Sequence, residues 1–160
     1  MNVLFYLIAF ELLNVSLIDL KSKKIANYWT LVNILIAIAF YVFGGFAFEW
    51  RIFIFPVATI VLGFFLFLAK IMGAGDSKYL ASLFIMLPFH YQQIYLENVL
   101  LSTILVGGVL FIAKLVLKYK RIKGYALSWH FKGVIEEIRS RFSYAPVLFL
   151  AWLLLGKELW

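Results

Sequence analysis

Residues 52–69 read IFIFPVATIVLGFFLFLA, eighteen consecutive positions without a charged side chain. A helix needs about 20 predominantly apolar residues to cross a hydrocarbon layer roughly 30 Å thick, and this run with its immediate neighbours is long enough. Its apolar residues are continuous and do not alternate with polar ones, which favours a helix over a strand of a transmembrane barrel. The stretch therefore predicts a membrane-spanning helix at about residues 52–71.

Similar apolar runs recur along the chain of 160 residues, of which 65% are hydrophobic and 14% charged, with a mean hydropathy of +0.98. A soluble domain of this size has too much surface to hide so much apolar material. We therefore expect an all-α integral membrane protein that forms a single membrane-embedded domain over residues 1–160. Its six predicted spans cover residues 3–20, 28–48, 52–71, 77–93, 95–117 and 144–160.

The fourth predicted span is the weakest of the six. Its apolar stretch, from Tyr79 to Phe89, is short for a full crossing, and Pro88 should kink or end the helix because proline lacks the backbone N–H. We retain it because the basic segments would otherwise fall on opposite sides of the membrane. The first span has no basic segment before it and no small-x-small site after it, so we expect a permanent helix there and not a cleaved signal.

The basic residues predict the orientation of the chain. With the N-terminus outside, thirteen of the fifteen Lys and Arg residues face the cytoplasm, which is the asymmetry typical of multi-pass membrane proteins. Topology thus explains the net charge of +7, and we expect the basic residues to meet lipid and no nucleic acid. The cytoplasmic residues are Lys21, Lys23, Lys24, Lys70, Lys78, Lys114, Lys118, Lys120, Arg121, Lys123, Lys132, Arg139 and Arg141, and the outer ones are Arg51 and Lys157.

The loop over residues 118–143 is the only sizeable segment expected outside the membrane. Apolar residues recur in it at helical spacing with charged residues between them, which predicts a cytoplasmic amphipathic helix before the last span. Such a helix would lie on the inner leaflet or pack against the helix bundle. Its apolar positions are Leu127, Phe131, Val134, Ile135, Ile138 and Phe142.

Two aspartates occur in the whole chain, Asp19 and Asp76, and both fall at the cytoplasmic ends of predicted spans. Two carboxyl groups in a partly desolvated site cannot both ionise readily, so one keeps a proton while the other acts as a base on water. The residues alone leave a simpler interpretation open, in which Asp76 caps the helix after a glycine-rich turn and Asp19 is an ordinary charge beside lysines. With no cysteine and two separated histidines, the sequence favours neither a thiolate nucleophile nor a metal or cofactor site.

Three segments resemble the motifs of the type IV prepilin peptidases. Gly73-Ala74-Gly75-Asp76, followed by Ser77-Lys78 and an apolar helix, resembles the Gly-x-Gly-Asp motif of that family. Asp19, the basic stretch after it and Ile25-Ala26-Asn27 resemble its first motif, which ends in Ile-Pro-Asn, and Ser143-Tyr144-Ala145-Pro146 is similar to the Pro-Tyr-Ala-Pro-like sequence before its last helix. Ala26 and Ser143 stand where the family has prolines, which removes rigidity but no reacting group. The segments follow the family's order, and the short, cysteine-free chain is most similar to the compact subgroup that serves Tad/Flp pili.

The resemblance implies an aspartyl endopeptidase of the bacterial cytoplasmic (inner) membrane that cleaves the leader peptide of prepilin-like proteins at the cytoplasmic membrane face. It implies no cofactor and no metal. A preflagellin-type peptidase, a non-catalytic scaffold with the same fold and a small transporter stay open as alternatives. The residues that the resemblance singles out are Asp19 and Asp76 as the catalytic pair, with Gly73, Gly75, Lys78 and Asn27 in support.

Three further polar residues have more than one interpretation. Glu11 lies in the middle of the first span, where an ionisable group is costly and usually faces the protein interior. A proton on its carboxyl group, or a hydrogen bond to a polar side chain such as Asn33, would reduce this cost. Lys78 would orient the substrate, lower the pKa of the aspartate pair, or extend to the lipid headgroups. Asn27 most simply caps the second span.

The helix dipole predicts different roles for the two aspartates. Asp76 begins a helix, where the dipole favours a negative charge, whereas Asp19 ends one, where it does not. We therefore expect Asp19 to hold the shared proton and Asp76 to act as the base, although the lysines that follow Asp19 oppose this by favouring its ionised form.

Overall fold

A computed structural model describes residues 2–43, 49–69, 72–117 and 143–159, which form six α-helices and one short 3-10 helix, with no strand among them. The predicted all-α fold is confirmed. The amphipathic helix expected before the last span lies outside the described residues. The elements are α1 (Asn2–Ser22), α2 (Asn27–Phe43), η1 (Trp50–Phe53), α3 (Ile54–Leu68), α4 (Ala74–Met86), α5 (Phe89–Leu117) and α8 (Ala145–Leu159).

The boundary between α4 and α5 differs from the prediction. The fourth segment was expected to continue to residue 93, but α4 ends at Met86 and the residues from Phe89 onward belong to α5. Leu87 is extended (φ −94°, ψ 133°), which is the conformation favoured before a proline. Pro88 cannot donate a helical hydrogen bond, so the chain turns there and begins a new helix.

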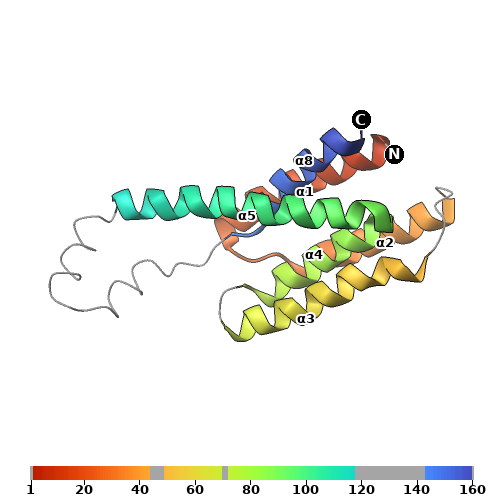
Figure 1. Cartoon of the computed structure of the whole chain (residues 1–160), viewed down its shortest axis with the longest axis horizontal. Helices are drawn as coiled ribbons and strands as arrows, with labels where there is room; N and C mark the ends of the chain where they lie inside the picture. The colour runs from red at the N-terminus through yellow and green to blue at the C-terminus, as the bar shows by residue number, and fades with distance from the viewer. Residues whose placement is uncertain (1, 44–48, 70–71, 118–142, 160) are drawn as a thin grey trace.

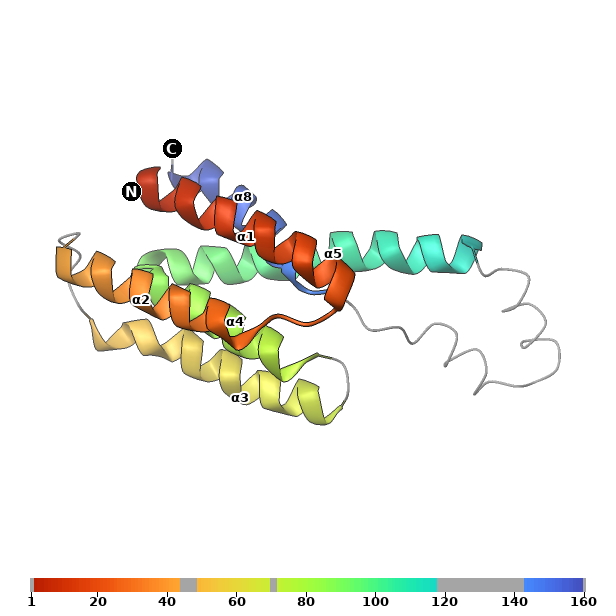
Figure 2. The same cartoon turned by 180° about the vertical axis from the view of Figure 1, so that it is seen from behind.

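The helices form two groups that lie side by side (Figures 1 and 2). In the first group α8 packs on both α1 and α5, and in the second α4 packs on both α2 and α3, with η1 beside α3 and α4. Because α1 and α8 run alongside each other, the start of α1 and the end of α8 lie together in Figure 1. The helix α5 extends past the end of α1 and the start of α4.

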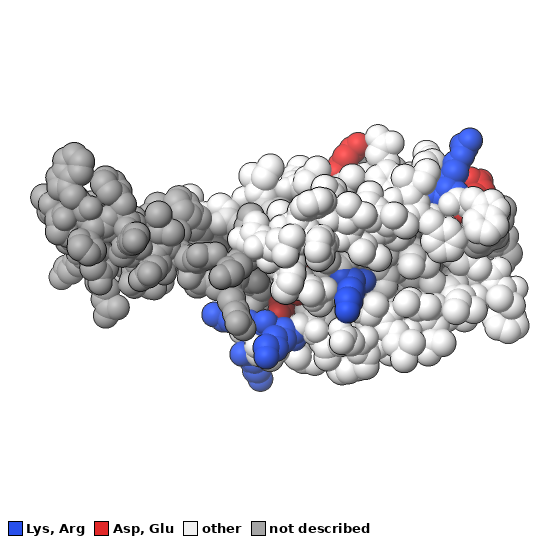
Figure 3. Space-filling model, turned by 90° about the horizontal axis from the view of Figure 1, so that it is seen from below, with Lys and Arg blue, Asp and Glu red and all other residues white. Residues whose placement is uncertain are grey.

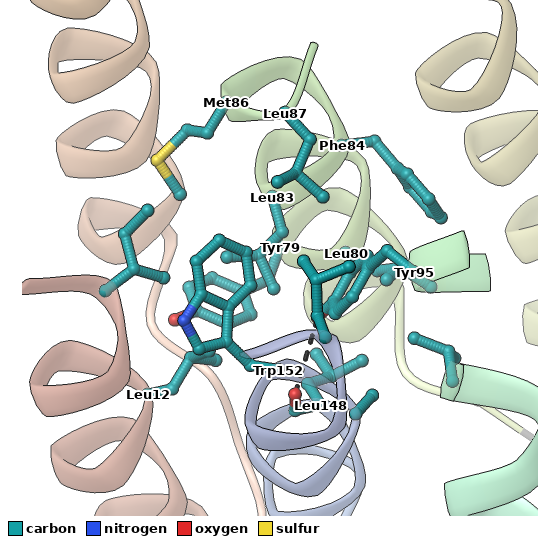
Figure 4. Packing of buried hydrophobic residues seen from close by; sticks show 14 of the residues in the cluster. Leu12, Tyr79, Leu80, Leu83, Phe84, Met86, Leu87, Tyr95, Leu148 and Trp152 are labelled. Carbon is teal, nitrogen blue, oxygen red and sulfur yellow. Dashed lines mark hydrogen bonds between the residues drawn. The ribbon is translucent and has the colours of Figure 1, made fainter. Parts of the chain in front are cut away.

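The hydrophobic core lies where the two groups meet. Trp152 of α8 is 1% exposed, stacks on Phe5 of α1 with ring centroids 5.8 Å apart, and donates from Nε1 to the Phe5 carbonyl oxygen at 3.1 Å. The edge of Tyr95 from α5 meets the same indole. Close packing of the three rings and the hydrogen bond among them help to hold α1, α5 and α8 together. The side chains that share the space in Figure 4 include Leu12, Tyr79, Leu83, Tyr95, Leu148 and Trp152.

Two glycines let helices approach closely. A Cβ on Gly63 of α3 would overlap the side chain of Ser77 on α4, and a Cβ on Gly156 of α8 would lie 2.7 Å from the ring of Phe5. Since glycine has no Cβ, these backbones can come nearer than any other residue would permit. Gly63 therefore sets how closely α3 approaches the first turn of α4, beside Asp76.

The outer surface of the helices is largely apolar. In Figure 3 most of the face is uncharged, and several Lys and Arg side chains gather near one end of the described bundle. Within the described residues, only Trp50–Leu68 is long and apolar enough to cross a membrane by length and composition, while Asn27–Phe43 and Ala145–Gly156 are shorter apolar helices. Large exposed apolar side chains include Phe43, Leu62, Phe65, Ile104, Val109 and Val116.

Candidate active site

Asp19 lies in the last turn of α1 and is only 2% exposed. The backbone N–H of Ala145, the first residue of α8, donates to its Oδ2 at 3.2 Å, and the hydroxyl of Ser143 donates to its carbonyl oxygen at 3.3 Å. The carboxyl group therefore sits at the N-terminus of α8, where the helix dipole favours a negative charge. The expectation that Asp19 occupies an unfavourable position in the helix dipole is thus wrong, because it considered only the end of its own helix.

The chain turns sharply just after Asp19. Lys23 follows the last residue of α1 in the left-handed conformation (φ 52°), and its N–H donates to the carbonyl oxygen of Asp19 at 2.7 Å. This is how many helices end, although glycine is the usual residue there. The turn directs residues 24–27 across the start of α4 and into α2.

Asp76 is the third residue of α4 and is partly buried. Its Oδ2 accepts a hydrogen bond from the N–H of Gly73 at 3.1 Å, and its own N–H donates to the Gly73 carbonyl oxygen at 3.1 Å. An acidic side chain that bonds back to the helix start in this way stabilises the first turn. The capping role left open by the sequence is therefore real. It uses one carboxyl oxygen and is compatible with a chemical role for the other.

Gly75 brings the two motif segments into contact. A Cβ on Gly75 would lie 3.0 Å from the carbonyl oxygen of Ile25, which belongs to the connection between α1 and α2. Ile25 is itself buried, so this connection has little freedom to move away. Gly73 also leaves room for a close neighbour, because a Cβ there would lie 3.0 Å from Oδ2 of Asp76. Both glycines of the Gly-x-Gly-Asp segment thus leave room that the site uses.

The electrostatic environment links the two carboxyl groups. Burial raises the pKa of Asp76 to about 6, the hydrogen bond from Gly73 opposes this rise, and the negative charge of Asp19 adds to it. Two carboxyl groups that interact in this way titrate as a pair. A pKa near 6 keeps a proton on Asp76 under conditions in which an ordinary aspartate is ionised. At neutral pH a group with this pKa is largely ionised, so the prediction that Asp76 is the base of the pair stays a prediction.

The remaining predicted residues lie at the surface. Asn27 is the first residue of α2 and is exposed, and Lys78 is exposed on α4. Lys21, Lys23 and Lys24 are exposed as well, so the described surface around the end of α1 is basic. Within the same part of the chain, no group of three or more His, Asp or Glu side chains is arranged to hold a metal ion.

Sequence reasoning missed the contacts that Ser143 and Ala145 make with Asp19. It treated Ser143 only as a replacement for a proline, yet a proline would have no hydroxyl to donate to the Asp19 carbonyl oxygen. The Ser143–Pro146 segment did carry a signal, since it resembles a family motif. Its pairing with Asp19 depends on the packing of α8 against α1, which no local pattern reports.

Fold and site together define an all-α protein in which two interacting carboxyl groups are held at the N-termini of two helices, by Ala145 for Asp19 and by Gly73 for Asp76. Paired carboxyl groups that share a proton are able to activate water. The chain matches the type IV leader peptidase family over residues 6–155 and belongs to that family, which implies a peptidase with a protein substrate. Neither a curated protein nor a solved structure was found to match it.

Proposed function

We propose that this protein is a membrane-embedded aspartic endopeptidase that removes the leader peptide of type IV prepilin-like proteins at the cytoplasmic face of the bacterial inner membrane. Asp19 and Asp76 are the catalytic pair. The observation that carries the proposal is that, in a member of the type IV leader peptidase family, the only two aspartates of the chain each have one carboxyl oxygen held by a backbone N–H at a helix start.

The mechanism needs one proton shared by the pair. The ionised carboxylate takes a proton from a water molecule, whose oxygen attacks the carbonyl carbon of the scissile peptide bond, while the protonated carboxyl group donates to the carbonyl oxygen. The tetrahedral intermediate then collapses, the C–N bond breaks, and a proton passes to the leaving amine. The pKa of Asp76, raised to about 6 by burial and partly by the charge of Asp19, supports one proton shared by the pair.

Backbone groups orient the pair for this reaction. The N–H of Ala145 holds Oδ2 of Asp19, and the N–H of Gly73 holds Oδ2 of Asp76, so that each carboxyl group has one oxygen fixed by a helix start. Reacting groups held in place by rigid backbone contribute to rate because little reorganisation is needed. This arrangement supports a catalytic role for Asp19 over the alternative that Asp19 is an ordinary charge beside lysines.

The surface of the helices supports the membrane location. Large exposed apolar side chains on α2, α3 and α5 are costly in water and ordinary in lipid. The helix α5 has 29 residues and is about 43 Å long at 1.5 Å per residue, which is enough to cross the hydrocarbon layer and reach the headgroups. The exposed lysines 21, 23, 24 and 78 would face anionic headgroups on the cytoplasmic side. The apolar segment of the substrate then reaches the site from the bilayer.

A cleavage assay in liposomes tests the proposal. The wild type, Asp19→Asn and Asp76→Asn are each incubated with a prepilin encoded near this gene, with and without a metal chelator. Glu97→Gln is the matched control, because it also turns a carboxyl group into an amide but lies exposed on α5. We expect the wild type and the control to cleave after the leader with or without chelator, and each aspartate variant to lose at least a factor of about 1,000 in rate.

Two results would overturn this function. Cleavage by both aspartate variants would make the aspartates structural and require another catalytic group. A wild type that cleaves neither prepilin nor preflagellin substrates would favour a scaffold that has kept the fold.

A further inference from the structure

The two aspartates belong to different helix groups. Asp19 is on α1, which packs mainly on α8, whereas Asp76 is on α4, which packs mainly on α2 and α3. Groups that meet mostly through apolar side chains can slide by fractions of an ångström at small cost, and a catalytic pair does not tolerate such sliding. A directional contact between α1 and the second group is therefore needed to hold the carboxyl groups in register.

Glu11 makes that contact. It is buried (6% exposed) in α1, and its Oε1 accepts a hydrogen bond at 3.1 Å from the hydroxyl of Tyr79 on α4, which is fully buried. When the amide nitrogen of Asn33 on α2 faces it, that nitrogen lies 2.9 Å from both carboxyl oxygens and the amide oxygen lies 3.0 Å from the hydroxyl of Ser82. The opposite orientation would place the amide oxygen against the carboxyl oxygens and is disfavoured. We name Glu11, Asn33, Tyr79 and Ser82 the polar cluster.

The polar cluster answers the question that the sequence left open about Glu11. Of the two arrangements considered, the hydrogen bond to Asn33 forms in the favoured orientation of its amide, and the structure adds Tyr79, which the sequence did not single out. Every side chain of the cluster that faces the Glu11 carboxyl group does so with a hydrogen-bond donor. A buried carboxyl group left without donors is costly, so α1 must stay where these donors reach it.

The position of the cluster relative to the aspartates fits a role in alignment. Glu11 precedes Asp19 by eight residues, about 12 Å along α1, and Tyr79 follows Asp76 by three residues, about 4.5 Å along α4. Both therefore lie on the side of the aspartates that leads into the bundle. A slip or rotation of α1 against α4 would break the bond between Glu11 and Tyr79 as it moved Asp19 away from Asp76.

We propose that Glu11 and Tyr79 are positioning residues, whose buried hydrogen bond holds α1 in register with α4 and so sets the separation of the two aspartates. The expected effect on the cleavage rate rests on the proposed function. The expected effect on the position of α1 relative to α4 does not. Glu11 itself takes no part in the reaction, because its oxygens are occupied by Tyr79 and Asn33.

Kinetics of four variants in liposomes test the positioning role. Glu11→Leu and Tyr79→Phe remove one partner each, Glu11→Gln keeps a carbonyl oxygen that accepts from Tyr79, and the double variant combines the first two. We expect kcat to fall by at least about tenfold in the single variants with KM within twofold of wild type. Glu11→Gln should recover kcat to within about threefold. The double variant should be no slower than the slower single variant, since both remove one interaction.

Gln92→Leu is the matched control. Gln92 is also fully buried, and its Nε2 lies 2.8–3.1 Å from the carbonyl oxygens of Ile52, Phe84 and Leu87, at the end of α4 away from Asp76. Its loss should lower the melting temperature but leave kcat within about threefold of wild type. Glu11→Leu with wild-type kcat, Glu11→Gln as slow as Glu11→Leu, or an equal loss of kcat in the control would each overturn the inference.

Spin labels test the geometry without substrate. The chain has no cysteine, so Leu20→Cys and Lys78→Cys, both at exposed positions beside the aspartates, accept one label each. The label distance should be narrowly distributed in the otherwise native chain, broaden by several ångströms with Glu11→Leu or Tyr79→Phe, and stay narrow with Gln92→Leu. Unchanged distances with all three overturn the positioning role even if the protein cleaves prepilin. The expected broadening, together with an unlabelled wild type that cleaves nothing, upholds the positioning role and refutes the proposed function.

Discussion

Replacing Gly75 by alanine tests whether the close approach of two motif segments sets the reaction geometry. The new Cβ would lie 3.0 Å from the carbonyl oxygen of Ile25, which is 0.4 Å short of the 3.4 Å at which ordinary contact begins. The opposing atom is backbone and belongs to a buried residue, so it cannot swing aside as a flexible side chain would. Relief must come from moving the first turn of α4, which carries Asp76, or the connection that follows Asp19.

The size of the effect follows from this displacement. Forcing an extra methyl group into a well-packed contact costs about 1–3 kcal/mol. A misplacement of about 1 Å lowers a rate by roughly 100-fold, so a shift of 0.4 Å should lower kcat by about sixfold. We expect KM to change less than kcat, because the substrate's apolar segment binds along the helices and not at Gly75.

The assay compares cleavage rates of a prepilin substrate in liposomes, together with melting temperatures. Gly107→Ala is the matched control, since it is the same substitution inside α5 at a position where the new Cβ would have no atom within 4 Å apart from the adjacent residues and the helix's own backbone. There the alanine should stabilise the protein by about 0.5–1 kcal/mol through helix propensity and leave kcat unchanged.

Two results for Gly75→Ala would refute the reasoning. Wild-type kcat with a wild-type melting temperature would mean that the contact with Ile25 has no consequence. A lower melting temperature with wild-type kcat would mean that the contact serves stability alone and does not align the aspartates.

Three other substitutions have defined outcomes. Because burial raises the pKa of Asp76 to about 6, ionising this group costs folding free energy, and the cost grows from about pH 4 to pH 6 and is constant above. Asp76→Asn should therefore raise the melting temperature at pH 8 and not at pH 4. The pKa shift of Asp76 corresponds to about 3 kcal/mol of folding free energy at full burial, and the partial exposure of Asp76 reduces this to about 1 kcal/mol. An equal change in melting temperature at both pH values would contradict the prediction. Ser143→Ala should lower the free energy of unfolding by about 1 kcal/mol through the lost hydrogen bond to Asp19, and an unchanged melting temperature would count against that bond. Gly63→Ala should cost about 2–3 kcal/mol because its Cβ overlaps Ser77, and adding Ser77→Ala should recover part of the loss, whereas strict additivity would show that the two residues are not in contact.

The helices were predictable because their signals are local. Long apolar runs, a proline at residue 88 and the polar segments between runs report directly on where a chain can remain helical. Within the described residues, the largest differences fell on either side of that proline, at the end of α4 and the start of α5. There the prediction continued the fourth helix to residue 93, although the structure ends it at Met86.

The candidate site was predictable in part. The sequence singled out Asp19, Asp76 and the two glycines beside Asp76, and the structure brings them to one place. It did not predict that Asp19 lies at the start of α8, and for that reason its argument from the helix dipole failed. It also noticed Glu11 without finding Tyr79, since a tyrosine in an apolar helix looks like an ordinary core residue.

The sequence by itself determined which segments are helical and which few side chains can carry chemistry, because the spacing of apolar residues, the backbone limits of glycine and proline, and the rarity of aspartate are properties of neighbouring residues or of composition. Only the tertiary structure decided which groups surround those side chains. Ala145 reaches Asp19 across 126 positions and Tyr79 reaches Glu11 across 68. Hydrogen bonds and charge interactions act through space over a few ångströms, so helix packing, and not order along the chain, determines the environment of each carboxyl group.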